Sequence, residues 1–402
     1  MSLVFAVNVP IEKRLVEERA EIARRRKERE EAHLYTTVGV LSEETFRCHH
    51  GFDLTSYDPP VVDEALPKQY RILKTTTVGD FAEKIAEEKG LNPLQLRFWV
   101  MVNRQNKTMR PDQVIQDPEM TMDEAYSRYA TKGHVFRVWL EVAQPSPDGT
   151  VSWPDSSTSV LVFLKNFDVP TQTLTGVGAT YVRKNQKVGE LGSTILDLMN
   201  WPAGTEFVLY EEIKHTMIDL MKPKQTFQQS EIQDGDIITF QKVVKESELP
   251  QTAIYPDAKS YYDYLVNRVI IKFAPIKANN NEEFELVLSK KMTYDQFSKK
   301  VAEYLGVEHT HLRFSTVIQS TGKPKGFIKR NPNQNAQTLQ SIMGAQVSGY
   351  GMSLVRQDAL YYEVLETSLS DFESKVCLRV TWLSEGITKE VGLHQSLDVD
   401  GS

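Results

Sequence analysis

FAEKIAEEKGLNPLQLRF at residues 81–98 and FSKKVAEYLGVEHTHLRF at residues 297–314 are two copies of one pattern. Aligned without gaps, they share Phe, Lys, Ala, Glu and Gly, a β-branched position, and a final Leu-Arg-Phe. Such a match between distant parts of a chain indicates an internal repeat. Phe81 and Ile85 lie one helical turn apart, as do their counterparts in the second copy, and the glycine permits a left-handed exit. We therefore predict in each copy an amphipathic helix that leads into a strand.

Strand patterns flank the first copy on both sides. Thr77 is suited to begin the helix and Gly90 to end it. Apolar and β-branched residues with strand character occupy 33–41, 70–75, 94–102 and 134–142. The predicted order is strand, strand, helix, strand, strand.

The same order returns twice further along the chain. The second unit is predicted to have strands at 159–167, 173–182, 206–212 and 236–242 and a helix near 188–199. The third is predicted to have strands at 268–275, 283–289, 312–318 and 353–357 and a helix near 294–305. Pro, Ser and charged residues interrupt the pattern at 144–158 and 245–253, where we expect linkers.

One helix crossing a curved sheet in this order resembles the ubiquitin-like β-grasp, so the predicted fold class is α+β with tandem ubiquitin-like domains. A charged connector helix is expected to precede them, because 11–32 carries Glu and Arg three and four residues apart with a sparse apolar stripe. The expected boundaries are 1–33 for the connector helix, 34–144, 145–245 and 246–366 for three domains, and 367–402 for the first hairpin of an incomplete fourth domain.

Composition limits the partners that we expect. The 402 residues include 47 Lys and Arg against 54 Asp and Glu, a net charge of −7 that disfavours nucleic acid and favours basic peptides. Cys48 and Cys377 are the only cysteines, so no disulfide framework is expected. No apolar run has the length of a membrane span or the features of a secretory signal. We expect no membrane partner.

The stretch EIQDGDIITFQK at 231–242 is the main candidate site, because it places Glu231, Asp234 and Asp236 on one corner. A calcium loop would need more alternating carboxylates and a closing Glu, and an acid–base pair would need a cleft that the sequence does not indicate. A purely structural turn explains Gly235 in a left-handed conformation, Ile232 in the core and an aspartate bonded to nearby amides. It does not explain why three carboxylates lie together. We therefore keep two interpretations of this turn, a purely structural one and the docking of a basic peptide.

Other candidates have weaker support. Cys48-His49-His50 contains the residue types of a thiol protease or a metal site, but it lacks a surrounding signature. His309 and His311 lack further Cys or His partners for zinc. The basic loop at 323–335 is either a solvated loop or a segment that docks on an acidic surface. We therefore predict no catalytic residue, no metal and no cofactor in this chain.

Nearly the whole chain resembles the C-terminal region of the herpesvirus-associated ubiquitin-specific protease family, which are thiol deubiquitinases. The likeness rests on five blocks: RKEREEAHLY, VLYEEIK (208–214), DGDIITFQK (234–242), SELPQTA (247–253) and SDFESKVCLRVTWL (370–383). The resemblance implies tandem ubiquitin-like domains, a catalytic core upstream of this region and a nuclear and cytoplasmic location. It also implies that Glu231, Asp234 and Asp236 receive Lys-rich peptides, although Ser230 departs from the family pattern, which has another acid there.

The leading hypothesis is a non-catalytic docking module that brings Lys- and Arg-rich segments of substrates or regulators to a catalytic core with which it also interacts. The alternative is a β-grasp scaffold that binds small GTPases or other proteins through a strand edge, without a link to ubiquitin removal. Such scaffolds usually have basic residues along the second strand, and 70–75 and 173–182 contain few.

Overall fold

The computed structural model describes residues 16, 18–22, 26, 30–57, 62–130, 135–245, 254–276, 283–318, 320–329, 337–343, 356–374, 376–384 and 387–395. The chain divides into two compact units, Met1–Lys259 and Ser260–Ser402. The described residues form three five-stranded mixed sheets and one two-stranded sheet, with helices between the strands. The fold is therefore α+β, as predicted.

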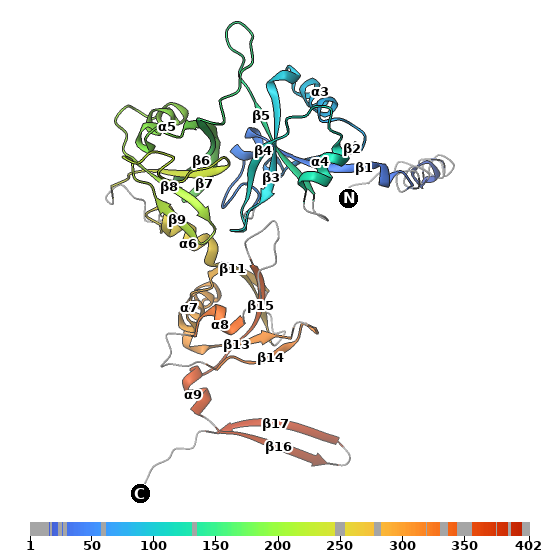
Figure 1. Ribbon diagram of the computed structural model, residues 1–402. Coiled ribbons are helices and arrows are strands. Elements are labelled where there is room, and N and C mark those ends of the chain that lie inside the picture. The colour runs from blue at the N-terminus through green and yellow to red at the C-terminus, as the bar shows by residue number, and fades with distance from the viewer. Residues whose placement is uncertain are drawn as a thin grey trace, which may run out of the picture. The chain divides into compact units, whose positions relative to one another are not determined.

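The first sheet has the strand order β2-β1-β5-β3-β4, with β1 and β5 parallel and the other neighbours antiparallel. Figure 1 shows α3 beside this sheet, where Phe81 and Ile85 are buried in its core. Its strands are β1 Tyr35–Leu41, β2 Lys68–Leu73, β3 Leu96–Asn103, β4 Met109–Val114 and β5 Phe136–Val142. Its helices are α2 Glu43–Arg47, α3 Val78–Lys89 and α4 Met122–Tyr129, with short 3-10 turns at Ala32–Leu34, Asp63–Ala65 and Pro93–Gln95.

The second sheet repeats this order as β7-β6-β10-β8-β9, again with one parallel pair, β6 and β10. The helix α5, preceded by a 3-10 turn at Val188–Glu190, contributes Leu191 and Ile195 to the core. Its elements are β6 Ser159–Asp168, β7 Thr173–Arg183, α5 Leu191–Met199, β8 Phe207–Lys214, β9 Met217–Leu220 and β10 Asp236–Lys242.

The second unit contains the third sheet, ordered β12-β11-β15-β13-β14, and a hairpin of β16 and β17. Phe297 and Val301 of α7 are buried against this sheet. The strands are β11 Arg268–Pro275, β12 Phe284–Ser289, β13 Leu312–Val317, β14 Pro324–Phe327, β15 Arg356–Val364, β16 Val376–Ser384 and β17 Ile387–Gln395. The helices are α6 Ala258–Asn267, which begins at the end of the first unit, α7 Tyr294–Leu305, α8 Leu339–Met343 and α9 Leu369–Ser374, with a 3-10 turn at His309–His311.

The repeated pattern has the same local structure in both copies. Thr77 and Thr293 each begin their helix with a capping box, in which the side chain accepts a hydrogen bond from the third helical amide. Gly90 and Gly306 end the helices with φ values of 66° and 67°, in the left-handed region that glycine adopts without strain. The predicted helix-to-strand unit is confirmed.

The prediction of four strands in each unit is wrong, because each five-stranded sheet has a further strand, β4, β9 or β14. These strands lie at sheet edges and are short or polar, as in MRPDQV and PKGF, so they lack the alternation of apolar residues that marks a half-buried strand. The strand predicted at 353–357 is also displaced: β15 begins at Arg356, and 353–355 lie outside the described residues. The predictions did not include α4 or α6.

The predicted connector helix is described only in part. Val16, the segment 18–22, Arg26 and Glu30 are helical, and Arg26 Nε donates to Glu30 Oε1 at 2.9 Å, one turn apart on an exposed surface. The rest of 1–33 before Glu30 lies outside the described residues, as do 246–253 of the second linker and 330–335 of the basic loop.

The two sheets of the first unit share a hydrophobic cluster in addition to their own cores. Trp139 of β5 and Phe163 of β6 pack edge to face with ring centroids 4.7 Å apart, and Phe46 of α2 contacts both rings. Successive side chains of β6 point to opposite faces, so Val162 and Leu164 enter the core of the second sheet while Phe163 enters the shared cluster. The strand is buried on both faces, which explains its continuous apolar run.

Candidate functional site

The predicted acidic turn enters β10 through a left-handed glycine. Gly235 has a φ of 84°, and Ile232, only 5% exposed, packs in the core of the second sheet. A Cβ on Gly235 would lie 2.5 Å from the carbonyl oxygen of Pro111 in β4, so glycine is needed for a close approach as well as for its conformation. The turn is therefore packed against the first sheet.

Two of the three predicted site residues are used within the molecule. Asp234 Oδ1 accepts a hydrogen bond from the backbone amide of Leu161 at 2.7 Å, and Asp236 Oδ2 accepts one from the amide of Gln233 at 2.8 Å. Arg104, which follows β3, forms an ion pair with Asp236 and donates to the carbonyl oxygen of Asp234. The structural part of the sequence interpretation, an aspartate bonded to nearby amides, is confirmed.

Glu231 has a different environment. Its side chain is exposed, and its φ of 58° places a non-glycine residue in the left-handed region. The turn thus presents Glu231 to solvent, whereas Asp234 and Asp236 are half-buried. Burial raises the pKa of Asp234, while the hydrogen bond from Leu161 lowers it.

A second pair of acidic residues lies beside the turn and was not predicted. Glu211 of β8 is the direct cross-strand partner of Asp219 in β9, so their side chains lie on one face of the sheet. The pKa of Glu211 is raised to about 7, mainly by burial and in addition by the negative charges of Asp236, Asp219 and Glu231, against the effect of Arg110. We call Glu211, Asp219, Glu231 and Asp236 the acidic surface.

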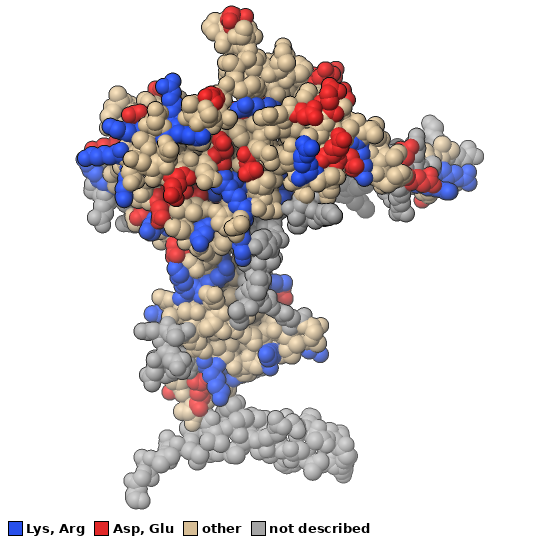
Figure 2. Space-filling view, viewed as in Figure 1, with Lys and Arg blue, Asp and Glu red and all other residues tan. Residues whose placement is uncertain are grey.

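The acidic surface retains excess negative charge despite the pairing of Asp236 with Arg104. Burial is the largest cause of the raised pKa of Glu211, and the repulsion from Asp236 and that from Asp219 each exceed the attraction of Arg110. Figure 2 shows acidic side chains over β8 and β9, with basic ones among them. A cation that binds here would gain Coulomb energy and relieve the repulsion between Glu211 and Asp219.

The alternation in VLYEEIK could have identified Glu211, because it places Glu211 and Glu212 on opposite faces of β8. Glu212 is buried and Glu211 is half-exposed. Asp219 belongs to the short edge strand β9, whose register against β8 is irregular between Glu212 and Lys214. No sequence signal places Asp219 opposite Glu211.

A buried ionic network holds the second sheet against the first and so fixes the position of the acidic turn. The ammonium group of Lys165 contacts Glu212 Oε2 at 2.9 Å and donates to the carbonyl oxygens of Gly51 and Asp53, each at 2.8 Å. Arg110 pairs with Asp53 at 3.1 Å and with Glu212 at 3.2 Å. Two anions balance two cations, as fully buried charges require.

The Cys48-His49-His50 motif does not form a catalytic arrangement. His49 is buried, its Nε2 lies 2.9 Å from the carbonyl oxygen of Ser56, and its ring packs against Phe46 and Tyr57. Cys48 is a free thiol at the end of α2. Among the described residues, His49 makes its ring hydrogen bond to the backbone of Ser56, and not to Cys48 as an activating base would. His49 therefore acts as a packing residue, and burial holds its pKa well below the usual range.

The other histidine pair also makes local contacts. His311 Nδ1 lies 3.1 Å from the carbonyl oxygen of Leu365, and the carbonyl of His309 accepts a hydrogen bond from Ser298. Within the part of the chain that the structure describes, no group of three or more Cys, His, Asp or Glu side chains could hold a metal ion. No described helix is long and apolar enough to cross a membrane.

Comparisons with known proteins identify similar sequences. The family profile described as "ICP0-binding domain of Ubiquitin-specific protease 7" matches residues 96–343. The chain is 32% identical over 410 residues to ubiquitin carboxyl-terminal hydrolase 15 of Schizosaccharomyces pombe, which covers 100% of this chain and 36% of that protein. It is 30% identical over 395 residues to ubiquitin C-terminal hydrolase 12 of Arabidopsis thaliana, covering 95% of this chain and 33% of that protein. The chain thus spans about a third of the length of these relatives.

Proposed function

Because this chain belongs to the family of the ICP0-binding domain of ubiquitin-specific protease 7, we propose that it is a docking region of a deubiquitinating thiol protease. In this proposal the acidic surface holds Lys- and Arg-rich segments of substrates or regulators. The region itself is non-catalytic, and the catalytic core lies in another part of the parent enzyme. The parent enzyme acts in the nucleus and the cytoplasm.

The main support for the proposal is the cross-strand pair of Glu211 and Asp219. Like charges directly opposite one another destabilise a sheet, so this pair has a cost that folding alone does not explain. The predicted site residues Glu231 and Asp236 add to the same negative potential. A lysine ammonium group from a partner would offset this repulsion with charge-assisted hydrogen bonds.

Asp234 and Asp236 have a modified role in this proposal. Because Arg104 already pairs with Asp236, an incoming lysine either displaces the guanidinium or binds to Glu211, Asp219 and Glu231 beside it. Asp234 orients the turn through Leu161 and adds negative charge near the first sheet. The three residues predicted from the sequence therefore remain part of the proposed site, with Glu211 and Asp219 added.

The fold supports an interpretation as tandem ubiquitin-like β-grasp domains. All three five-stranded sheets share one strand order. Counted along the chain, the first and fifth strands of each sheet are neighbours and run parallel, and a helix lies between the second and third strands. We propose the domain boundaries given above, with 1–33 as a connector to the catalytic core and 367–402 as the beginning of a fourth domain. That core is itself proposed to be a partner of this region.

Each charge-assisted contact contributes roughly 1.5 to 3 kcal/mol before the ordering of the peptide is subtracted. An isolated Lys-rich peptide should therefore bind with a dissociation constant of about micromolar to millimolar. Tighter partners would need additional contacts or more than one docking segment. Added salt should weaken binding, because Asp219 and Glu231 are exposed to screening.

Calorimetric titration of a Lys-rich peptide tests the docking proposal. Asp219→Lys should reduce affinity by about tenfold or more, because it introduces a cation opposite Glu211. Asp197→Lys is the matched control: it makes the same charge change at an exposed site on α5 and should leave affinity nearly unchanged. Equal losses in both variants, or none in either, would contradict a local acidic site.

The non-catalytic part of the proposal has a separate test. The chain alone should not hydrolyse a fluorogenic ubiquitin conjugate, because His49 bonds a backbone carbonyl and is not in position to activate Cys48. Turnover that Cys48→Ala abolishes would overturn this part of the proposal.

A further inference from the structure

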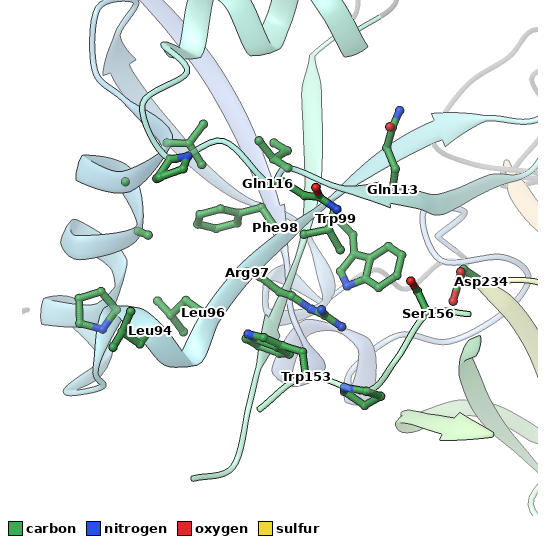
Figure 3. A pocket seen from close by; sticks show the side chains of 18 of the residues that line it. Leu94, Leu96, Arg97, Phe98, Trp99, Gln113, Gln116, Trp153, Ser156 and Asp234 are labelled. Carbon is green, nitrogen blue, oxygen red and sulfur yellow. The ribbon is translucent and has the colours of Figure 1, made fainter. Parts of the chain in front are cut away.

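A groove of about 670 Å³ lies beside the acidic turn in the first unit. Its size is that of a typical ligand site. Its walls come from α3, β3, the end of β4 and the segment that contains Trp153. Figure 3 shows Leu94 at one end of the groove, Arg97 and Trp153 along its middle and Asp234 at the other end.

One end of the groove is apolar and open to solvent. Leu94 is 73% exposed on the 3-10 turn at Pro93–Gln95, and the neighbouring Pro93 also lines this end. This 3-10 turn is fixed by the side chain of Asn92, which accepts from the amide of Leu94, so the leucine is held outward by local structure. An exposed leucine at the end of a groove offers an apolar contact to a side chain of a segment bound there.

The rim of the groove favours a cation. Asp112 and Glu83 are exposed carboxylates on the lining, and Asp234 stands at the end nearest the acidic surface. Arg97, also on the lining, is already engaged. Its Nε donates to Glu141 at 2.7 Å, its Nη2 donates to the hydroxyl of Tyr181, and its guanidinium lies 4.0 Å from the ring centroid of Trp153.

Polar side chains lie between the two ends. Gln113 and Gln116 are exposed on the same wall, and each amide can donate to a backbone carbonyl and accept from a backbone amide. An extended peptide needs such partners for its main chain, because buried backbone groups without hydrogen bonds are costly. Along its length from Asp234 to Leu94, the groove therefore offers anionic groups, then hydrogen-bonding side chains, and then an apolar contact.

We propose that this groove binds an extended segment of a partner protein in which an apolar side chain accompanies the basic residues. The basic residue lies at Asp234 and the adjoining acidic surface, and the apolar side chain packs on Leu94 and Pro93. This inference rests on the proposed function and adds to it a requirement for a basic and apolar motif. A site that recognises charge alone would bind any Lys-rich segment. An additional apolar contact makes the site select those segments that also carry a suitably placed apolar side chain.

Fluorescence anisotropy with paired synthetic peptides tests the inference. Both peptides of a pair contain the same lysines in a background of Ser and Gly, and they differ at one position, which is leucine in one peptide and serine in the other. A series of such pairs moves this position along the peptide. At the best position the leucine peptide should bind about five- to tenfold more tightly, the gain expected from burying one such side chain in part. Leu94→Ser should remove this gain and leave the serine peptide unaffected.

Leu73→Ser is the matched control, because Leu73 is an exposed leucine of the same sheet, 42% accessible, outside the groove lining. It should preserve the difference between the peptides. If Asp219→Lys weakens both peptides but leucine gives no advantage at any position, the docking site stands and the groove inference fails. If neither peptide binds, the proposed function fails with it.

Another occupant would give a different result. A dimer that is detected by analytical ultracentrifugation and dissociated by Leu94→Ser would assign the apolar end to a second copy of this chain and would overturn the inference. Circular dichroism of each variant checks that the exposed substitutions leave the fold intact.

Discussion

Glu211 of β8 and Asp219 of β9 face each other directly across the second sheet, so two carboxylates occupy the same side of adjacent strands. Burial, together with the negative charges of Asp236 and Asp219, raises the pKa of Glu211 to about 7. The charge of this surface therefore changes near neutral pH. That property distinguishes it from a solvated acidic turn, whose carboxyls would ionise near pH 4.

Peptide binding should depend on pH through Glu211. A bound lysine favours the ionised carboxylate, and protonation of Glu211 below its pKa removes one negative charge, so affinity should rise between about pH 6 and about pH 8. For a pKa of about 7 the increase is at most about tenfold. Titration calorimetry across this range measures it. Glu211→Gln should flatten the profile, and an unchanged slope in that variant would exclude Glu211 as the origin.

Arg104 should compete with the peptide for Asp236. Arg104→Gln removes the internal cation from the carboxylate, and affinity should rise by about three- to fivefold, the value of a partly exposed ion pair. Lys74→Gln is the control, because it removes a cation from an exposed ion pair elsewhere in the first unit, the pair with Asp123 of α4. A loss of affinity in Arg104→Gln would show instead that Arg104 holds the turn in its binding conformation.

The buried network should make the first two sheets unfold together. Lys165→Met leaves Glu212 with one buried cation fewer and should cost about 3 to 5 kcal/mol of unfolding free energy in urea titrations. Glu212→Leu should cost at least as much, since it leaves both Lys165 and Arg110 without that carboxylate. The double variant should lose less than the sum of the two, and strict additivity would contradict a coupled network.

His49 should make the first unit less stable in mild acid. Burial lowers its pKa in the folded state, so the unfolded chain takes up the proton first as pH falls below about 6.5, and unfolding becomes easier. The difference in unfolding free energy between wild type and His49→Gln should change by about 1.4 kcal/mol per pH unit below about pH 6.5.

Comparing the two proteins isolates the effect of His49. Glu211 has the opposite effect, because its raised pKa adds stability as pH falls through about 7, but this effect is the same in both proteins and cancels in the difference. His50→Gln, at the exposed neighbouring histidine, is the control. A constant difference across pH would show that His49 is not held neutral.

The sequence predicts the repeated part of the fold well, because its signals are local. Thr77 and Gly90 define a helix by capping and by the left-handed exit, and the helix predicted near 294–305 coincides with α7. Edge strands such as β9 depend on the neighbouring strand for their hydrogen bonds, and residues such as Asp219 carry no apolar signal. Their existence is decided by tertiary pairing.

The candidate site is less predictable for a similar reason. The sequence identifies Glu231, Asp234 and Asp236 as neighbours, but it cannot show that Arg104, 132 residues from Asp236, pairs with it. Nor does it show the groove beside Asp234, whose walls come from segments that fold together. One sequence signal does mark the contact between the first and second sheets. It is the single lysine in the apolar strand β6, because Lys165 lies on the same face of the strand as Phe163, which packs in the shared cluster.

Paramagnetic relaxation measurements test the docking site most directly. A Lys-rich peptide with a nitroxide next to its lysine would be titrated into isotopically labelled protein, and amide signals would be compared before and after reduction of the label. The amides of Glu211, Asp219, Glu231 and Asp236 should broaden most, with those of α5 unaffected. Uniform broadening, or a maximum in Ser260–Ser402, would contradict a binding site on the second sheet.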